Sequence, residues 1–137
     1  MASIYKEIII DASPADVWDA LRDFGALHTR LVPGFVTDTR LDGDARIVTF
    51  ANGTIAREVL VDCDDTRRRL VYAIVSERIR QHSASAQVFA EPDGRTRLEV
   101  RQWLPAHVTG ATEEGWGQSF AKLEAHLATT AAEGTSR

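Results

Sequence analysis

Glu58 is the residue whose type and position in the sequence most directly suggest chemistry. Side chains alternate between the two faces of a strand, so Ala56, Glu58 and Leu60 share one face of the strand predicted there. If this face is buried, a carboxylate lies among apolar neighbours, where an unpaired charge is costly. Three interpretations follow: Glu58 is a general acid or base, it anchors a polar atom of a ligand, or it is a structural carboxylate paired with Arg46 or another arginine.

Two more polar side chains are expected near Glu58. Leu70, Tyr72 and Ile74 share one face of the following strand, and His82 lies near the start of the strand after it. A buried Tyr72 hydroxyl needs a hydrogen-bond partner and could orient a ligand carbonyl, and His82 could form an acid–base dyad with Glu58. The alternatives are that Tyr72 serves packing and that His82 is exposed or structural.

The other residue types argue against the common cofactor sites. Cys63 is the only cysteine, and the four histidines are separated without the local spacing of a zinc site. The sequence contains no phosphate-binding glycine loop, P-loop, nucleophile elbow or internal repeat. We therefore expect no metal and no cofactor.

Charge and hydropathy narrow the class of partner. The chain has 137 residues and a formal net charge of −4, and its basic residues are scattered, so nucleic acid is not the expected partner. No apolar run approaches the length of a membrane span or a signal peptide, so we expect a soluble, cytoplasmic protein without stable membrane insertion. A small hydrophobic molecule fits better as the partner, and a homodimer stays open.

The elements that position these side chains follow from the order of the chain. A strand at 5–11 is followed by a helix that starts at Ser13-Pro14 and by a second short helix within 26–32. Six strands joined by tight turns come next, and the last helix is predicted at about 111–130, with Trp116, Phe120, Leu123 and Leu127 at helical spacing.

Sequential hairpins cannot form a parallel sheet, so this order predicts an α+β domain with one curved, seven-stranded antiparallel sheet. The final helix is the element long enough to cover the apolar face of that sheet. A strongly curved sheet wrapped around one helix leaves an internal cavity, and such spaces bind ligands. We expect a single domain over 1–132, followed by a flexible tail at 133–137.

Small residues on the predicted C-terminal helix support a space between helix and sheet. Gly115, Gly117 and Ser119 lie within this helix. A glycine inside a helix costs about 1 kcal/mol against alanine, so glycines there indicate that room is wanted above the sheet. Close packing of the helix on the sheet is the alternative.

Four segments carry a resemblance to a known superfamily: ASPADVWDAL at 12–21, FGALHTRLVPGFV at 24–36, REVLVDCDDTRRRLVYAI at 57–74 and WGQSFAKLEAHL at 116–127. The chain resembles, over nearly its whole length, the START and birch-pollen-allergen superfamily in its small polyketide cyclase/dehydrase and lipid-transport branch. The resemblance implies a helix-grip fold with an internal cavity. In the plant abscisic-acid receptors of this superfamily the matching strand carries an acidic residue that faces the pocket, but their gate loops are not matched here, so hormone reception is not implied.

The resemblance also implies which residues line the cavity. They are Val48, Phe50, Glu58, Tyr72, Ile74, His82, Ala84, Val100, Gln102, Gly115, Ser119 and Leu123.

Three functions are compatible with this site. The favoured one is binding of a small hydrophobic ligand, such as a lipid, a polyketide or an aromatic metabolite. The alternative is a cofactor-independent cyclase, dehydratase or isomerase in which Glu58 or His82 moves a proton and Tyr72 polarises a carbonyl. The third is a protein-interaction or dimerisation domain with an exposed apolar patch.

Overall fold

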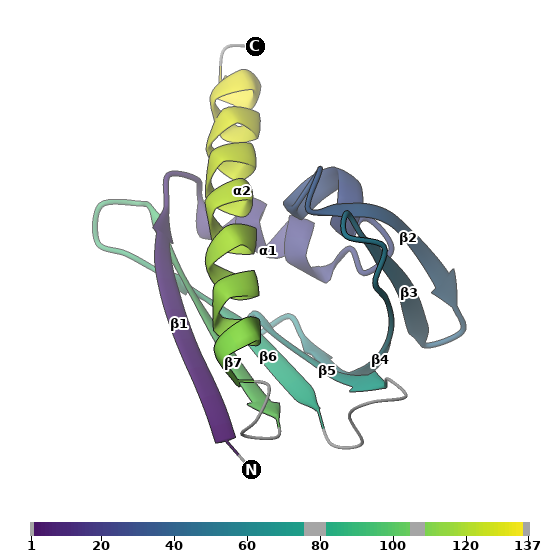
Figure 1. The fold of residues 1–137 in the computed structure, drawn as a ribbon. Coiled ribbons are helices and arrows are strands. Elements are labelled where there is room, and N and C mark those ends of the chain that lie inside the picture. The colour runs from purple at the N-terminus through teal and green to yellow at the C-terminus, as the bar shows by residue number, and fades with distance from the viewer. Residues whose placement is uncertain (1, 76–81, 105–108, 136–137) are drawn as a thin grey trace.

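A seven-stranded antiparallel sheet curves around a long C-terminal helix (Figure 1). The computed structural model describes residues 2–75, 82–104 and 109–135. In these ranges the strand order is β1-β7-β6-β5-β4-β3-β2, which confirms the expected α+β helix-grip fold. The elements are β1 (Ala2–Ile10), α1 (Pro14–Arg22), η1 (Leu27–Leu31), β2 (Val36–Asp42), β3 (Ala45–Phe50), β4 (Ile55–Asp64), β5 (Arg69–Val75), β6 (Ser83–Ala90), β7 (Thr96–Leu104) and α2 (Thr109–Thr135).

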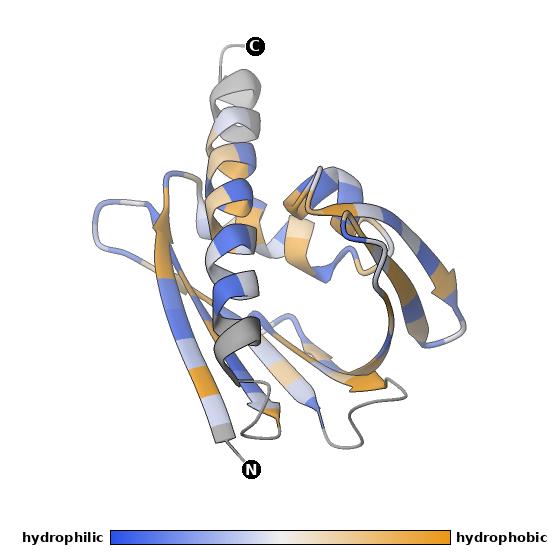
Figure 2. Cartoon of the chain, in the orientation of Figure 1, coloured by the Kyte–Doolittle hydropathy of each residue, from blue (hydrophilic) through white to orange (hydrophobic). Residues whose placement is uncertain are grey.

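Tight turns explain why β2 to β7 follow one another in the sheet. Gly43 between β2 and β3 has φ of 63°, and Gly94 between β6 and β7 has φ of 88°, a region of backbone space that glycine enters without strain. β1 pairs antiparallel with β7, so the two short helices carry the chain from one edge of the sheet to the other. Figure 2 shows hydrophilic and hydrophobic residues alternating along the strands, as expected for a sheet with one buried face.

Helix α1 begins where its capping residues predict. The Ser13 side chain accepts a hydrogen bond from the backbone N–H of Asp16 at 3.2 Å, and Pro14 occupies the first helical position. Val17 and Trp18 are buried against the core, and the Trp18 indole donates to Asp65 at 2.9 Å. This bond fixes the helix to the turn between β4 and β5.

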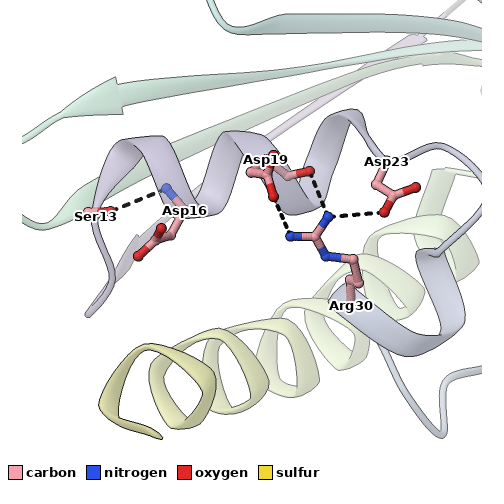
Figure 3. A network of polar contacts seen from close by, with 5 residues as sticks. All are labelled: Ser13, Asp16, Asp19, Asp23 and Arg30. Atoms are coloured by element: carbon pink, nitrogen blue, oxygen red, sulfur yellow. Dashed lines mark hydrogen bonds and ion pairs between the residues drawn. The ribbon is translucent and has the colours of Figure 1, made fainter. Parts of the chain in front are cut away.

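The second helix, η1, is a five-residue π-helix, whereas the sequence predicted only a short helix within 26–32. Arg30 ties it to α1 (Figure 3): its guanidinium donates to the Asp19 carboxylate at 2.6 Å, to the Asp19 carbonyl at 3.2 Å and to the Asp23 carboxylate at 3.0 Å. Gly34, with φ of 87°, follows shortly afterwards and turns the chain into β2. The α1–η1 pair thus forms one unit, and η1 connects it to β2 and α2.

Helix α2 is longer than the sequence predicted. It ends at Thr135 and so runs three residues into the segment expected to be a tail. Its buried face consists of Ser119, Phe120, Leu123 and Leu127, and it packs against β1 and η1. Among the helices described, none has the length and apolar character needed to cross a membrane.

Candidate functional site

A cavity of about 330 Å³ lies between the curved sheet and α2. Its walls are mostly apolar, and they include Leu27 and Leu31 of η1, Leu70 and Ile74 of β5, and Phe120 of α2. Ligand pockets usually measure about 300–1,000 Å³ and combine apolar walls with a few polar groups, so this cavity lies at the small end of that range.

All but two of the residues predicted to line the cavity do line it. The residues that line it are Phe50, Glu58, Tyr72, Ile74, His82, Val100, Gln102, Gly115, Ser119 and Leu123. Whether they contact a ligand stays a prediction.

Val48 and Ala84 share the faces of these residues but are not part of the cavity wall; both are fully buried in the core. Ala84 lies in register between Tyr72 and Gln102, and its methyl group is shorter than either neighbour. Val48 lies between Arg46 and Phe50 on its strand, and these two longer side chains reach the cavity in its place. Alternation thus identified the correct face but not the depth of each side chain.

The wall also contains three polar residues beyond the twelve predicted ones, namely Arg46, Thr54 and Trp116. The sequence predicts Arg46 as a partner of Glu58, and alternation also puts it on the same face as Phe50, so a signal for its place in the wall is present. Helical spacing places Trp116 on the apolar face of the last helix, which is compatible with a core position and with stacking on a ligand. No sequence pattern predicts that η1 forms part of the wall, because this depends on how the short helices pack over the sheet.

Arg46 and Glu58 form a buried ion pair in the cavity wall. They are register partners on β3 and β4, and Arg46 Nε donates to Glu58 Oε1 at 2.7 Å. The two side chains are only 4% and 7% exposed. Arg46 Nη1 also donates to the Phe24 carbonyl at 3.3 Å, and its guanidinium carbon lies 4.0 Å from the centre of the Phe24 ring and 5.1 Å from that of Tyr72. The carboxylate therefore has the arginine partner that one of the three interpretations required.

A second polar group links three elements at the cavity: His82 just before β6, Gln102 on β7 and Trp116 on α2. The Trp116 indole N–H donates to Gln102 Oε1, and Gln102 Nε2 contacts His82 Nε2. Because an indole nitrogen can only donate, it fixes the orientation of the Gln102 amide, whose N–H must then donate to His82 Nε2. The proton of the neutral imidazole is thereby assigned to Nδ1, which is buried and has no hydrogen-bond partner among the described residues. Burial lowers the pKa of His82 below its ordinary value of 6.5, so the neutral form dominates at neutral pH.

This lowered pKa predicts a pH-dependent stability. Below pH 6.5 the unfolded chain protonates His82 before the folded chain does, so the free energy of unfolding should fall as the pH decreases from 6.5 towards the folded-state pKa. The free energy of unfolding, measured with denaturant and plotted against pH between about 7.5 and 5.5, should have a slope that corresponds to the uptake of less than one proton on unfolding. His82→Gln should remove that component, and an unchanged slope in the variant would contradict the assignment.

Tyr72 is the third polar feature of the wall. Its ring packs edge-on against Phe24, with 6.4 Å between the ring centres. Burial raises the pKa of its hydroxyl far above the ordinary value of 10.0, and the nearby Glu58 charge adds to the shift, so the phenol stays neutral. Within the part of the chain that the structure describes, this hydroxyl makes no hydrogen bond.

Glu58 and His82 line the same cavity but are held by different partners. Glu58 is bonded to Arg46 and His82 to Gln102, and no hydrogen bond joins the two across the described residues. Nor do the described residues include a group of three or more His, Cys, Asp or Glu side chains that could hold a metal ion. The arrangement can enclose an apolar molecule and offer it a neutral hydrogen-bonding group.

Comparisons with known proteins identify the family through a family model and the fold through solved structures. The family model described as polyketide cyclase/dehydrase and lipid transport matches residues 1–133. An uncharacterized protein from Bacillus thuringiensis is similar with a TM-score of 0.82 and 16% identity, over 92% of this chain and 98% of that chain. A protein from Nitrosospira multiformis has a TM-score of 0.80 and 18% identity over 92% and 96% of the two chains, and one from Thermobifida fusca has 0.74 and 27% over 93% and 91%. No curated protein matches.

Proposed function

Because this chain belongs to the polyketide cyclase/dehydrase and lipid transport family, we propose that it binds one small hydrophobic molecule between its sheet and α2. Candidate ligand classes are a lipid, a polyketide and an aromatic metabolite. A cavity of about 330 Å³ favours a compact ring system or a short chain among these.

The observation that carries this proposal is the combination of a cavity between sheet and helix and its mostly apolar walls. Leu31, Leu70, Ile74 and Phe120 come from three different elements and all face the same space. Transfer of apolar ligand surface from water to such walls is favourable by about 25 cal/mol per Å². Affinity can therefore come from the walls, while Tyr72 orients a polar atom of the ligand.

The geometry supports binding more strongly than proton transfer. A general base needs a free basic atom within reach of the substrate proton. Glu58 Oε1 already accepts a hydrogen bond from Arg46, and His82 Nε2 accepts one from Gln102. One basic atom of each group that an acid–base mechanism would use is thus already engaged within the protein.

A titration with the uncharged fluorescent probe N-phenyl-1-naphthylamine tests the proposal. We expect saturable binding of one probe per chain and a rise in thermal stability at saturating probe, since a ligand at about 100 times its Kd stabilises the folded state by about 2.7 kcal/mol. Native mass spectrometry of the freshly purified protein should detect a co-purified small molecule. Fluorescence that never saturates, with an unchanged melting temperature, would refute the proposal.

A further inference from the structure

We infer that the cavity selects electrically neutral ligands and excludes a ligand whose ionised group would have to enter it. The inference rests on the proposed function, because it specifies the ligand class of the same site. Arg46, Glu58 and His82 are the described wall residues whose side chains carry a charge or gain one near neutral pH. In each case the surrounding side chains cancel that charge or prevent it from forming.

The charges of Arg46 and Glu58 cancel within the wall. The pair is closed by the 2.7 Å bond, and both side chains are buried. The guanidinium is further occupied by the Phe24 carbonyl and covered by the Phe24 and Tyr72 rings. An anionic ligand would gain the Arg46 charge only by breaking a buried pair, which leaves the Glu58 charge uncompensated.

His82 adds no charge because its hydrogen-bond partner requires the neutral imidazole. Gln102 directs its amide N–H towards His82 Nε2, and the Trp116 indole holds the amide in that orientation. A protonated His82 would point its own Nε2–H at this N–H group, so two donors would face each other. Trp116 and Gln102 are therefore positioning residues that keep the wall neutral.

A ligand that enters this space meets mostly apolar walls and, among the residues that the structure describes, no free counter-charge. An ionised carboxylate or phosphate would lose its hydration without compensation, whereas a hydroxyl or carbonyl oxygen can meet the Tyr72 hydroxyl. Ile55 lines the cavity and is 64% exposed, so it lies at the mouth. At this mouth an ionised group could remain in water. The inferred ligand is a compact, uncharged, mostly apolar molecule with a neutral oxygen.

Two fluorescent probes with the same ring system test the charge rule. 8-Anilinonaphthalene-1-sulfonate is N-phenyl-1-naphthylamine with one added sulfonate, so the pair differs chiefly in charge. We expect the wild-type protein to bind the neutral probe at least about tenfold more tightly, a factor equal to about 1.4 kcal/mol. Binding of the sulfonate probe is measured by its displacement of the neutral probe. Sulfonate probe that binds only to the outer surface is therefore not counted.

Glu58→Gln should change this preference, since it leaves the Arg46 charge uncompensated in the wall. We expect the affinity for the sulfonate probe to rise at least about tenfold relative to that for the neutral probe. Asp42→Asn is the matched control: it removes the same charge from the exposed Arg57–Asp42 pair and should leave the ratio of the two affinities unchanged.

A double variant keeps the test decisive if Glu58→Gln does not fold. The double variant Arg46→Gln/Glu58→Gln has a neutral wall and should retain the wild-type preference for the neutral probe. Equal affinities of the wild-type protein for the two competing probes would overturn the charge rule and leave the proposed function intact. Absence of saturable binding for both probes would overturn the two together.

Discussion

Arg46→Met should lower the free energy of unfolding by about 3–5 kcal/mol, the usual cost of removing one partner from a buried ion pair. The variant leaves Glu58 in the wall without the donor that now lies 2.7 Å from Oε1. It also removes the guanidinium that packs over the rings of Phe24 and Tyr72. Domains of this size are stable by about 5–15 kcal/mol, so the loss is a large part of the total. Denaturant unfolding followed by circular dichroism measures it.

A matched substitution separates burial from mere charge removal. Arg57→Met breaks the Arg57–Asp42 pair, whose side chains are 42% and 61% exposed, and should change the stability little. The double variant Arg46→Met/Glu58→Met should recover most of the loss, because an apolar pair of similar volume replaces a buried ion pair at little cost. If Arg46→Met and Arg57→Met destabilise equally, Glu58 is not sealed from water.

Much of this fold is predictable from the sequence because its strands are bounded by local signals. Strands β3, β5 and β7 are among the strands expected between tight turns, and each begins directly after a turn that contains aspartate. Alternation then assigns Glu58 and Tyr72 to one face, and that face is buried. Both signals act over a few residues, so a single sequence contains them.

The site depends on contacts that local patterns do not encode. The Arg46–Glu58 pair could be anticipated, because the turn between β3 and β4 fixes their register. The Trp116–Gln102–His82 chain could not, because helical periodicity identifies the buried face of α2 but not its rotation and depth above β7. The position of η1 beside α1 also depends on such contacts: Arg30 is held by Asp19 and Asp23, which belong to the preceding helix and its C-terminal cap.

Gly115→Leu should abolish most ligand binding while it stabilises the protein. Gly115 lines the cavity, and a Cβ placed there would meet no atom within 4 Å, so a leucine can extend into the space. We expect the Kd for N-phenyl-1-naphthylamine to rise at least about tenfold, which corresponds to about 1.4 kcal/mol. Replacing a helical glycine by leucine should raise the stability of the chain by about 0.5–1 kcal/mol. Fluorescence titration and thermal unfolding measure the two effects on one sample.

Gly117→Leu distinguishes a filled cavity from a change in the helix. Gly117 lies two residues further along α2, is exposed and does not line the cavity, and a Cβ added to it would likewise meet no atom within 4 Å. The two variants therefore share the gain in helix propensity and differ in whether the new side chain enters the cavity. If both bind the probe like the wild-type protein, the probe lies elsewhere. If only Gly115→Leu loses affinity, the space between α2 and the sheet is where the ligand is held, and the missing side chain at 115 is what leaves room for it.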